Sequence, residues 1–381
     1  MTNTILRPTR FELVHLSLLD VGALRGTTSF GLTSADGRAV NIYLIMGPNG
    51  AGKTTVLESI YASMHLLEAR EHPEVGIDAV DNAQGGLQLD ALVTLDDGQR
   101  ARQFLLSIVA GSSGLLRTWT NEQLEKLGAE KQIILGYKRS GIGTGVSRAL
   151  DSHPEALAFS EAILERLEET TPALFDTGNG FPTVLYFPSD RGIKRPPHGE
   201  RAVTRPDGLG YRPAHRFNAD GATWSASIDN LFVWFTWLDD GREKRCRELV
   251  NQLIFRGSKN LRPVDRPTLS VPVEVEGGSR HRLDQLSSGE RQLVQLVVRV
   301  ASHMTGSTIV LIDETEQHLH LVMRRRLINI IKNWAREYEG MSFLLTSHQV
   351  DSMRILAPKL EEEGLVKGGC LVKPKFRLPH E

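Results

Sequence analysis

Four short apolar runs, separated by polar or amphipathic stretches, dominate the hydrophobic pattern of the chain. They occupy residues 41–46, 183–187, 308–312 and 342–346. Each has the length of a strand, and a continuous apolar run is typical of a parallel strand that is covered on both faces. We therefore expect an α/β protein with a mixed or parallel central sheet.

A second group of strand-like runs lies in the first third of the chain, at residues 11–16, 27–32, 87–95 and 102–109. The run at 87–95 alternates apolar and polar residues, as expected of a strand with two different faces. The Asp-Gly pair at 97–98 follows it and is typical of a tight hairpin. The runs at 11–16 and 27–32 are expected to be strands that lead into the glycine-rich loop at 47–55, and the runs at 87–95 and 102–109 predict an antiparallel β annex.

Apolar residues at helical spacing predict helices in several of the other stretches. The expected helices run from residue 56 to about 70, from 155 to 169, from 228 to 238 with a charged continuation to 256, and from 293 to 301. The last of these is apolar on nearly all sides and is therefore expected to be buried. The helices after residue 228 predict a helical second lobe.

Two basic stretches rich in glycine are interpreted as irregular. Residues 121–148 are interpreted as a solvated flexible loop, with a nucleic-acid contact as the alternative. Residues 191–222 combine Pro, Gly and Arg with almost no apolar residues, which predicts a mobile and locally basic segment.

Composition and charge narrow the class of protein. The 381 residues include 45 Lys and Arg against 46 Asp and Glu, so only a local patch is expected to contact nucleic acid. Cys246 and Cys370 lie far apart without metal-ligand spacing, which favours a reducing compartment. The first residues lack the apolar core of a signal peptide, and no run reaches membrane-spanning length. A cytoplasmic protein with no membrane partner is expected.

A glycine-rich loop at residues 47–55 supplies the first candidate chemistry. Its sequence, GPNGAGKTT, fits the pattern G-x-x-x-x-G-K-[ST], in which small residues bring backbone N–H groups onto a triphosphate. Lys53 is expected to reach the outer phosphates, and the Thr54 hydroxyl to ligate Mg²⁺. The helix that follows favours an anion through its dipole and free amides. The candidate ATP-binding residues are Asn49, Gly50, Ala51, Gly52, Lys53, Thr54 and Thr55.

Polar residues that end two of the buried runs supply further candidates. Asp313 and Glu314 follow the third run, at the strand end where ligands bind in parallel sheets. Asp313 is expected to hold Mg²⁺ together with Thr54, and Glu314 to orient and deprotonate the attacking water. His348 follows the fourth run and is a candidate contact for the γ-phosphate, with a structural role as the alternative.

The segment LSSGERQ at residues 286–292 precedes the buried helix at 293–301. Small residues at the start of a helix offer backbone amides to an anion. Taken alone, however, a Ser-Ser-Gly sequence in this place is an ordinary N-cap. The anion-site interpretation depends on the other motifs in the chain.

The four motifs GPNGAGKTT, LSSGERQ, TIVLIDE and LLTSH, in this order, resemble the ATP-binding-cassette ATPases over about residues 11–356. The resemblance is to the branch that contains the structural-maintenance-of-chromosomes, RecF and overcoming-lysogenization-defect ATPases. The segment TEQHLH at 315–320 is similar to the last of these. It implies that His318 and His320 belong to a subunit-contact loop, with a metal pair as the alternative. The implied fold is the head of a P-loop NTPase.

Departures from the family pattern concern the loops around the site. Thr315 stands where the family has a proline. Residues 187–191 occupy the place of a glutamine-bearing loop, in which Ser189 or Asp190 would take the role of the glutamine. The family often has an N-F-R-G-like turn before the phosphate loop. This chain has Ala23-Leu24-Arg25-Gly26 there, so only the Arg-Gly half matches, and Arg25 is a candidate nucleotide contact.

The resemblance also implies an assembly and its cofactors. ATP and Mg²⁺ would lie between two copies of the chain in a head-to-tail dimer or a higher oligomer. Catalytic roles would fall to Glu314 and His348. The residues that would contact the ATP of the other copy are Ser287, Ser288, Gly289 and Glu290. The implied division places one part of lobe I at 1–190, lobe II at 191–304 and the rest of lobe I at 305–381.

The biological role is predicted from what the chain lacks. The chain has no heptad pattern over several turns, so a long coiled-coil arm is not expected. The roughly thirty residues after His348 are too few for a Toprim nuclease domain. The first hypothesis is therefore an ATPase that controls a separate effector, a nuclease or toxin, in anti-phage defence. The alternatives are a RecF-like ATPase of DNA repair or loading, which binds nucleic acid through Arg191–Arg216, and the ATPase subunit of a membrane transporter.

Overall fold

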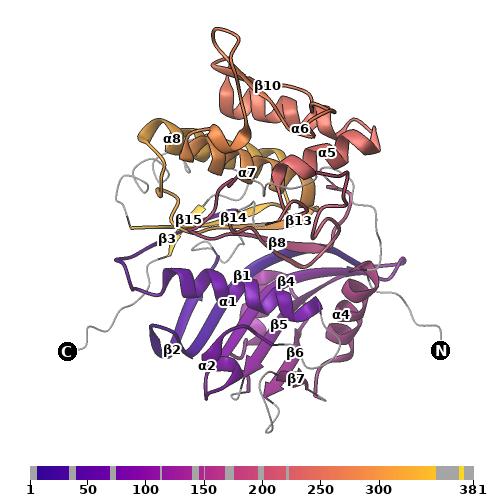
Figure 1. Cartoon of the computed structure of the whole chain (residues 1–381). Helices are drawn as coiled ribbons and strands as arrows, with labels where there is room; N and C mark the ends of the chain where they lie inside the picture. The colour runs from indigo at the N-terminus through magenta and orange to yellow at the C-terminus, as the bar shows by residue number, and fades with distance from the viewer. Residues whose placement is uncertain are drawn as a thin grey trace.

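The computed structural model describes most of the chain and forms two six-stranded sheets and a helical lobe (Figure 1). The described residues are 7–33, 40–68, 74–111, 114–139, 146–149, 151–167, 176–195, 201–219, 223–348 and, for the backbone alone, 369–372. The expected end of the first helix near residue 70, and the resemblance beyond residue 348, fall outside these ranges.

The central sheet has the strand order β15-β3-β14-β13-β8-β9, and all of its pairings are parallel. The bounds are β3 (Ile42–Met46), β8 (Pro182–Phe187), β9 (Ala214–Arg216), β13 (Ser307–Ile312), β14 (Ser342–Ser347) and β15 (Gly369–Val372). Every residue of β8 and β13 is buried. The predicted central sheet, built from four apolar runs, is confirmed; the edge strands β9 and β15 were not predicted.

The second large sheet contains the predicted annex and has the order β2-β1-β4-β5-β6-β7. Its strands are β1 (Arg7–Val21), β2 (Leu24–Gly31), β4 (Gly86–Asp96), β5 (Ala101–Gly111), β6 (Gln132–Arg139) and β7 (Val146–Arg148). The hairpin of β4 and β5 closes at the expected Asp-Gly turn, with Asp96 opposite Ala101. The antiparallel annex is confirmed, with one parallel pairing between β5 and β6.

The central sheet separates two hydrophobic cores. Helix α1 (Lys53–His65) and the annex cover one face, and the helical lobe covers the other (Figure 1). Successive residues of a strand point to opposite faces. On β14, Phe343 and Leu345 therefore belong to the core under the helical lobe, whereas Leu344 belongs to the core beside α1.

The helical lobe follows β9 and is the predicted second lobe. It contains α5 (Ile228–Leu238), α6 (Arg242–Val250), a π-helical turn η2 (Asn251–Phe255), a small sheet and α7 (Ser288–His303); α8 (Leu321–Glu337) packs beside it. The small sheet consists of β10 (Lys259–Leu261), β11 (Val273–Val275) and β12 (Arg280–His281). Helix α7 is buried along nearly its whole length, as its sequence predicts. In the described part of the chain, no helix is both long and apolar enough to cross a bilayer.

The prediction that residues 121–148 form a loop was wrong. The stretch 121–148 contains α3 (Asn121–Leu127), which a capping box of Thr120 and Gln123 begins, and the strands β6 and β7. Residues 140–145, with their glycines, lie outside the described residues.

The predicted helix at 155–169 is α4 (Pro154–Leu167), and the first predicted helix continues beyond α1 as the 3-10 turn η1 (Leu66–Glu68). The short elements α2 (Asp78–Asp81) and η3 (Leu283–Gln285) were not predicted.

The segment 191–222, which was predicted to be mobile, is irregular in most of its described residues, but part of it packs against the body of the protein. Ala214 and Phe217 are buried, and Ala214 pairs with Val184 as β9 joins the central sheet. The sheet edge supplies backbone partners that composition does not reveal. Residues 196–200 and 220–222 lie outside the described residues.

The turns that precede β13 and β14 approach each other closely. A Cβ atom at Gly340 would lie 1.7 Å from the carbonyl oxygen of Gly306, whereas a Cβ at Gly178 would meet nothing within 4 Å. Only glycine at position 340 allows the two turns to touch without moving backbone.

We expect Gly340→Ala to lower the free energy of unfolding by about 3 kcal/mol or more, because backbone must move to relieve the overlap. Gly178→Ala is the matched control and should unfold within about 0.5 kcal/mol of the wild type. Chemical denaturation followed by circular dichroism measures both. Equal stability of the two variants would contradict the close approach.

Candidate nucleotide-binding site

The glycine-rich loop connects β3 to α1 at the carboxyl end of the central sheet. Gly50 and Gly52 have φ values of 78° and 81°, a left-handed conformation that favours glycine. Gly52 is the N-cap of α1 and provides no side-chain cap for its first amides. The helix start therefore keeps N–H groups for an anion, as the sequence predicts.

Lys53 is buried and lies back over the loop that precedes it. Its Nζ donates hydrogen bonds to the carbonyl oxygens of Gly47 and Pro48, both at 2.8 Å. The ammonium group is therefore held beside the loop by neutral acceptors. A phosphate would offer it a charged acceptor, and charge-assisted hydrogen bonds are roughly twice as strong as neutral ones.

The carboxylate of Asp313 joins three elements of the site. The Thr54 hydroxyl, on α1, donates to its Oδ2 at 2.8 Å, and the Thr346 hydroxyl, on β14, donates to its Oδ1 at 2.6 Å. Asp313 itself follows β13 and is only 2% exposed. The structure thus brings together Thr54 and Asp313, the two predicted metal ligands, and adds a residue that was not predicted.

Thr346 also accepts a hydrogen bond, from the backbone N–H of Glu314 at 2.8 Å. Its single hydroxyl therefore fixes both members of the predicted acid pair. The signal for this role in the sequence is the one hydroxyl side chain that interrupts the apolar run Phe343-Leu344-Leu345 before the strand ends.

Glu314 has a φ of 43°, which is uncommon for a residue other than glycine. Its backbone is held on both sides, because its N–H bonds to Thr346 and its carbonyl oxygen accepts from Nη2 of Arg191 at 3.0 Å. Strained backbone that is fixed in this way is concentrated at functional sites. The position is consistent with the predicted catalytic role, which remains a prediction.

Arg191 is a buried residue of the site that the sequence placed in a mobile segment. Its guanidinium donates to the carbonyl oxygens of Pro188, Asp313 and Glu314. Burial lowers its pKa to about 10, against the opposing effect of the Asp313 and Glu316 charges, so it stays protonated at neutral pH. Arg191 therefore ties the loop after β8 to the acid pair.

The neighbouring loop residues line a shallow cavity of about 300 Å³ next to Arg191. Ser189, Asp190, Ser288 and His318 are among its lining residues. Which of the first two takes the role of the family glutamine remains a prediction. Arg25 is exposed near the start of β2, directly after the turn at residues 22–23, where Gly22 lies close to Thr55 of α1.

Ser287 and Glu290 form a capping box at the start of α7. The carboxylate of Glu290 accepts from the N–H of Ser287 at 3.0 Å, from its hydroxyl at 2.7 Å and from Nζ of Lys259 at 2.8 Å. Burial raises the pKa of Glu290, but the bonds from Lys259 and Ser287 outweigh it and the pKa is lowered overall. Within one chain, this segment therefore acts as the N-cap of α7, which is the alternative interpretation of its sequence.

The remaining residues of the segment face outward or toward the loop after Glu314. Ser288 is exposed, and a Cβ on Gly289 would lie 3.2 Å from the Leu319 side chain. None of the contacts described for residues 287–290 is with the loop 47–55. Contact of these residues with ATP of another copy remains a prediction.

His348 is positioned by Glu316, a residue that was not predicted to matter for the site. The backbone N–H of His348 donates to Oε1 of Glu316 at 2.8 Å, and its Nδ1 lies 2.8 Å from the same atom. Thr315 donates to the other carboxylate oxygen at 3.1 Å. The ring is about one third exposed. Its contact with a γ-phosphate remains a prediction.

A strand, glycine loop and helix that bring a lysine, a hydroxyl group and a buried aspartate together define the fold and site of a P-loop ATPase. The chain belongs to the family described as "AAA domain, putative AbiEii toxin, Type IV TA system", whose model matches residues 138–353. The matched range includes Asp313, Glu314 and His348, whereas the glycine loop precedes it.

Three individual proteins are also similar to the chain. UvrABC system protein A of Deinococcus radiodurans is 30% identical over 89 residues, which is 23% of this chain and 9% of that protein. The SMC head domain from Thermotoga maritima is 13% identical, with coverage of 90% of this chain and 92% of that one and a TM-score of 0.36. An Smc head domain from Pyrococcus furiosus, bound to the C-terminal domain of ScpA, is 11% identical, with 91% and 92% coverage and a TM-score of 0.42.

We expect Thr346→Val to slow ATP hydrolysis and to lower the free energy of unfolding by about 1–3 kcal/mol, because it leaves the Glu314 N–H and one Asp313 oxygen without their buried partner. Thr346→Ser keeps the hydroxyl and should retain most of the hydrolysis rate and most of the free energy of unfolding. Steady-state phosphate release and chemical denaturation give the two quantities. Hydrolysis by the valine variant at the serine variant's rate would contradict this role of the hydroxyl.

Proposed function

We propose that this chain is an ATP-hydrolysing switch that closes head to tail with a second copy and controls a separate effector protein. The observation that carries the proposal is the bonded path from Thr54 through Asp313 to Thr346. It joins the helix of the glycine loop to the strand that leads to His348. The proposal keeps the division of the chain at residues 190 and 304.

The residues around Asp313 fit a magnesium ion bound with ATP. The Thr54 hydroxyl and the Asp313 carboxylate are hard oxygen ligands in direct contact, as Mg²⁺ prefers. When bound, the ion would neutralise charge that develops on the phosphates. Lys53 and the amides at the start of α1 bind the phosphates, and Glu314 orients the attacking water and accepts its proton.

A second copy completes the site in this proposal. Ser288 is exposed at the start of α7, where backbone amides favour an anion. Leu321 and Val322, at the start of α8, are large apolar residues that are 50% and 67% exposed. Apolar side chains left in solvent near an anion-binding helix start support a protein contact there. ATP would lie between the two copies.

The opening step is assigned to Arg191 and its loop. Arg191 holds the carbonyl oxygens of the acid pair, and two residues later the carbonyl of Ile193 accepts from Arg291 of α7 at 2.9 Å. Movement of the acid pair after phosphate release would therefore reach α7, which carries Ser288. Hydrolysis would then open the dimer.

The effector is proposed from the family. Its description names an AAA domain and a putative toxin of a toxin–antitoxin system, which supports a role in such a system. We propose that the effector is a separate nuclease or toxin in anti-phage defence. A DNA-binding repair ATPase is the second candidate, favoured by the short match to UvrABC system protein A. Salt-sensitive DNA binding that stimulates hydrolysis would select the second candidate.

We expect Glu314→Gln to bind ATP without hydrolysing it and to accumulate as a dimer, because water activation is lost while phosphate binding remains. Light scattering after gel filtration, with ATP and Mg²⁺, measures the mass. Lys53→Ala should stay in the unclosed form under the same conditions. A Glu314→Gln protein that has the same mass with and without ATP would overturn the dimer switch.

Mixing two inactive variants tests the head-to-tail arrangement directly. Lys53→Ala removes phosphate binding, and Ser288→Arg blocks the surface that should contact the ATP of the other copy. Each variant alone should be inactive, whereas a mixed dimer contains one intact composite site and should regain hydrolysis. A mixture as inactive as its components would contradict sites shared between copies.

A further inference from the structure

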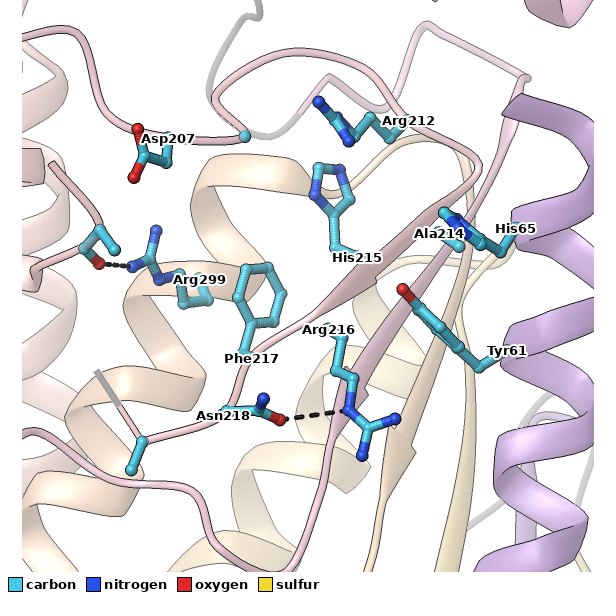
Figure 2. A pocket seen from close by; sticks show the side chains of 13 residues that line it. Tyr61, His65, Asp207, Arg212, Ala214, His215, Arg216, Phe217, Asn218 and Arg299 are labelled. Atoms are coloured by element: carbon cyan, nitrogen blue, oxygen red, sulfur yellow. Dashed lines mark hydrogen bonds between the residues drawn. The ribbon is translucent and has the colours of Figure 1, made fainter. Parts of the chain in front are cut away.

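A second cavity, of about 380 Å³, lies between α1 and α7 next to β9 (Figure 2). The last turns of α1 contribute Tyr61 and His65, and the last turn of α7 contributes Arg299. None of its lining residues belongs to the loop 47–55 or to the acid pair. Its volume is near the lower end for pockets that bind small molecules.

Three guanidinium groups line this cavity, against the single carboxylate of Asp207 (Figure 2). Arg299 is 3% exposed, lies over the Phe217 ring and donates to the carbonyl oxygen of Ala226. The cavity combines cationic groups from two separate segments, since Arg212 and Arg216 come from the strand region and Arg299 from α7.

The partners of the two outer arginines hold them weakly. Arg212 lies 3.4 Å from Glu68, and Arg216 lies 3.4 Å from Glu58, in ion pairs that solvent reaches. Such exposed pairs are worth about 0–1 kcal/mol. Arg216 also donates to Oδ1 of Asn218 at 3.2 Å (Figure 2). A phosphate group can accept two hydrogen bonds from one guanidinium and would compete well with Glu68 for the Arg212 side chain.

His215 provides an observation that is independent of the arginines. It is 6% exposed and lines the cavity, and its Nε2 has no hydrogen-bond partner among the described residues. Burial, with the neighbouring His303 and arginine charges, lowers its pKa well below the ordinary value, so the ring is neutral and has one N–H to donate. A buried polar atom without a partner is costly unless a ligand supplies one.

The apolar part of the cavity consists of flat rings. Phe217 stacks on His215 with an interplanar angle of 7°, and Tyr61 stacks on His65 with an angle of 11°. Aromatic faces favour a planar ring in the ligand. The carboxylate of Asp207, which accepts from Ser225 at 2.7 Å, can accept further hydrogen bonds from amino or hydroxyl groups.

We propose that this cavity binds a small phosphate monoester that carries a flat ring, of the nucleoside monophosphate class. The phosphate contacts Arg212 and His215, which lie beside each other in the cavity, whereas Arg216 points to the opposite side of β9 (Figure 2). The ring of the ligand lies against the aromatic side chains. The site is separate from the proposed ATP site and its occupancy does not depend on hydrolysis.

Isothermal titration calorimetry of the full chain with AMP tests this proposal, and Lys53→Ala removes binding at the glycine loop. We expect Lys53→Ala to bind one AMP per chain, more tightly than adenosine or inorganic phosphate alone. Adding Arg212→Gln should weaken AMP binding at least about tenfold, because it removes charge-assisted hydrogen bonds to the phosphate, whereas Arg216→Gln should weaken it much less. Both side chains are 40% or more exposed, so the variants should fold.

Arg102→Gln is the matched control. Arg102 is as exposed as Arg216, pairs with Glu130 and lies over the ring of Phe104, as Arg216 pairs with Glu58 and lies over Tyr186. Its substitution should leave AMP affinity unchanged. Three outcomes would overturn the proposal: no AMP binding by Lys53→Ala, an equal loss in Arg102→Gln, or tighter binding of a short oligonucleotide than of AMP. The last would identify a nucleic-acid surface.

Discussion

The structure depends on a charged carboxylate that is held away from water between three segments of the chain. Asp313 is almost fully buried, and a buried carboxylate is stable only when its oxygens are well bonded. Each of its oxygens receives one hydroxyl, from α1 and from β14. The protein is therefore stable only when α1 and β14 are placed so that their hydroxyl groups reach Asp313, and the same placement assembles the site.

A buried cation, Arg191, lies near this carboxylate and interacts with it through charge. The Arg191 guanidinium is satisfied by backbone carbonyl oxygens of two loops, including those of Asp313 and Glu314. Its charge lies near the carboxylates of the acid pair and Glu316, which favours its protonated form. Breaking the contacts of Arg191 or of Asp313 would leave a buried charge without its partners. The loops after β8 and β13, which these contacts join, are therefore expected to move together.

Much of the fold follows from local patterns that the sequence displays openly. Continuous apolar runs identified the four inner strands, and the glycine loop and acid pair were placed correctly at their carboxyl ends. The alternation of Ile133, Leu135 and Tyr137 was also present, but the glycines around it favoured a loop. These three side chains are buried in a hydrophobic core that forms only when the strands of the annex come together, so the local sequence does not reveal it.

The parts that could not be predicted depend on contacts between distant segments. Arg191 is 122 residues from Asp313, and among arginines and prolines it resembles a solvated residue until the loops meet. The same holds for β9, which is three residues long and acquires its partners from β8. His348 was identified as a candidate, whereas Glu316, which positions it, carries no signal beyond its place in the TEQHLH segment.

The two-sided core of β14 has a consequence for how this protein can change over evolution. A slip of one residue would exchange Leu344 with its neighbours between the two cores, and it would present Leu345 to Asp313 in place of Thr346. The contact between Gly306 and Gly340 fixes where the strand starts. Insertions and deletions in the turn before β14 should therefore be absent among active relatives, however freely other loops vary in length.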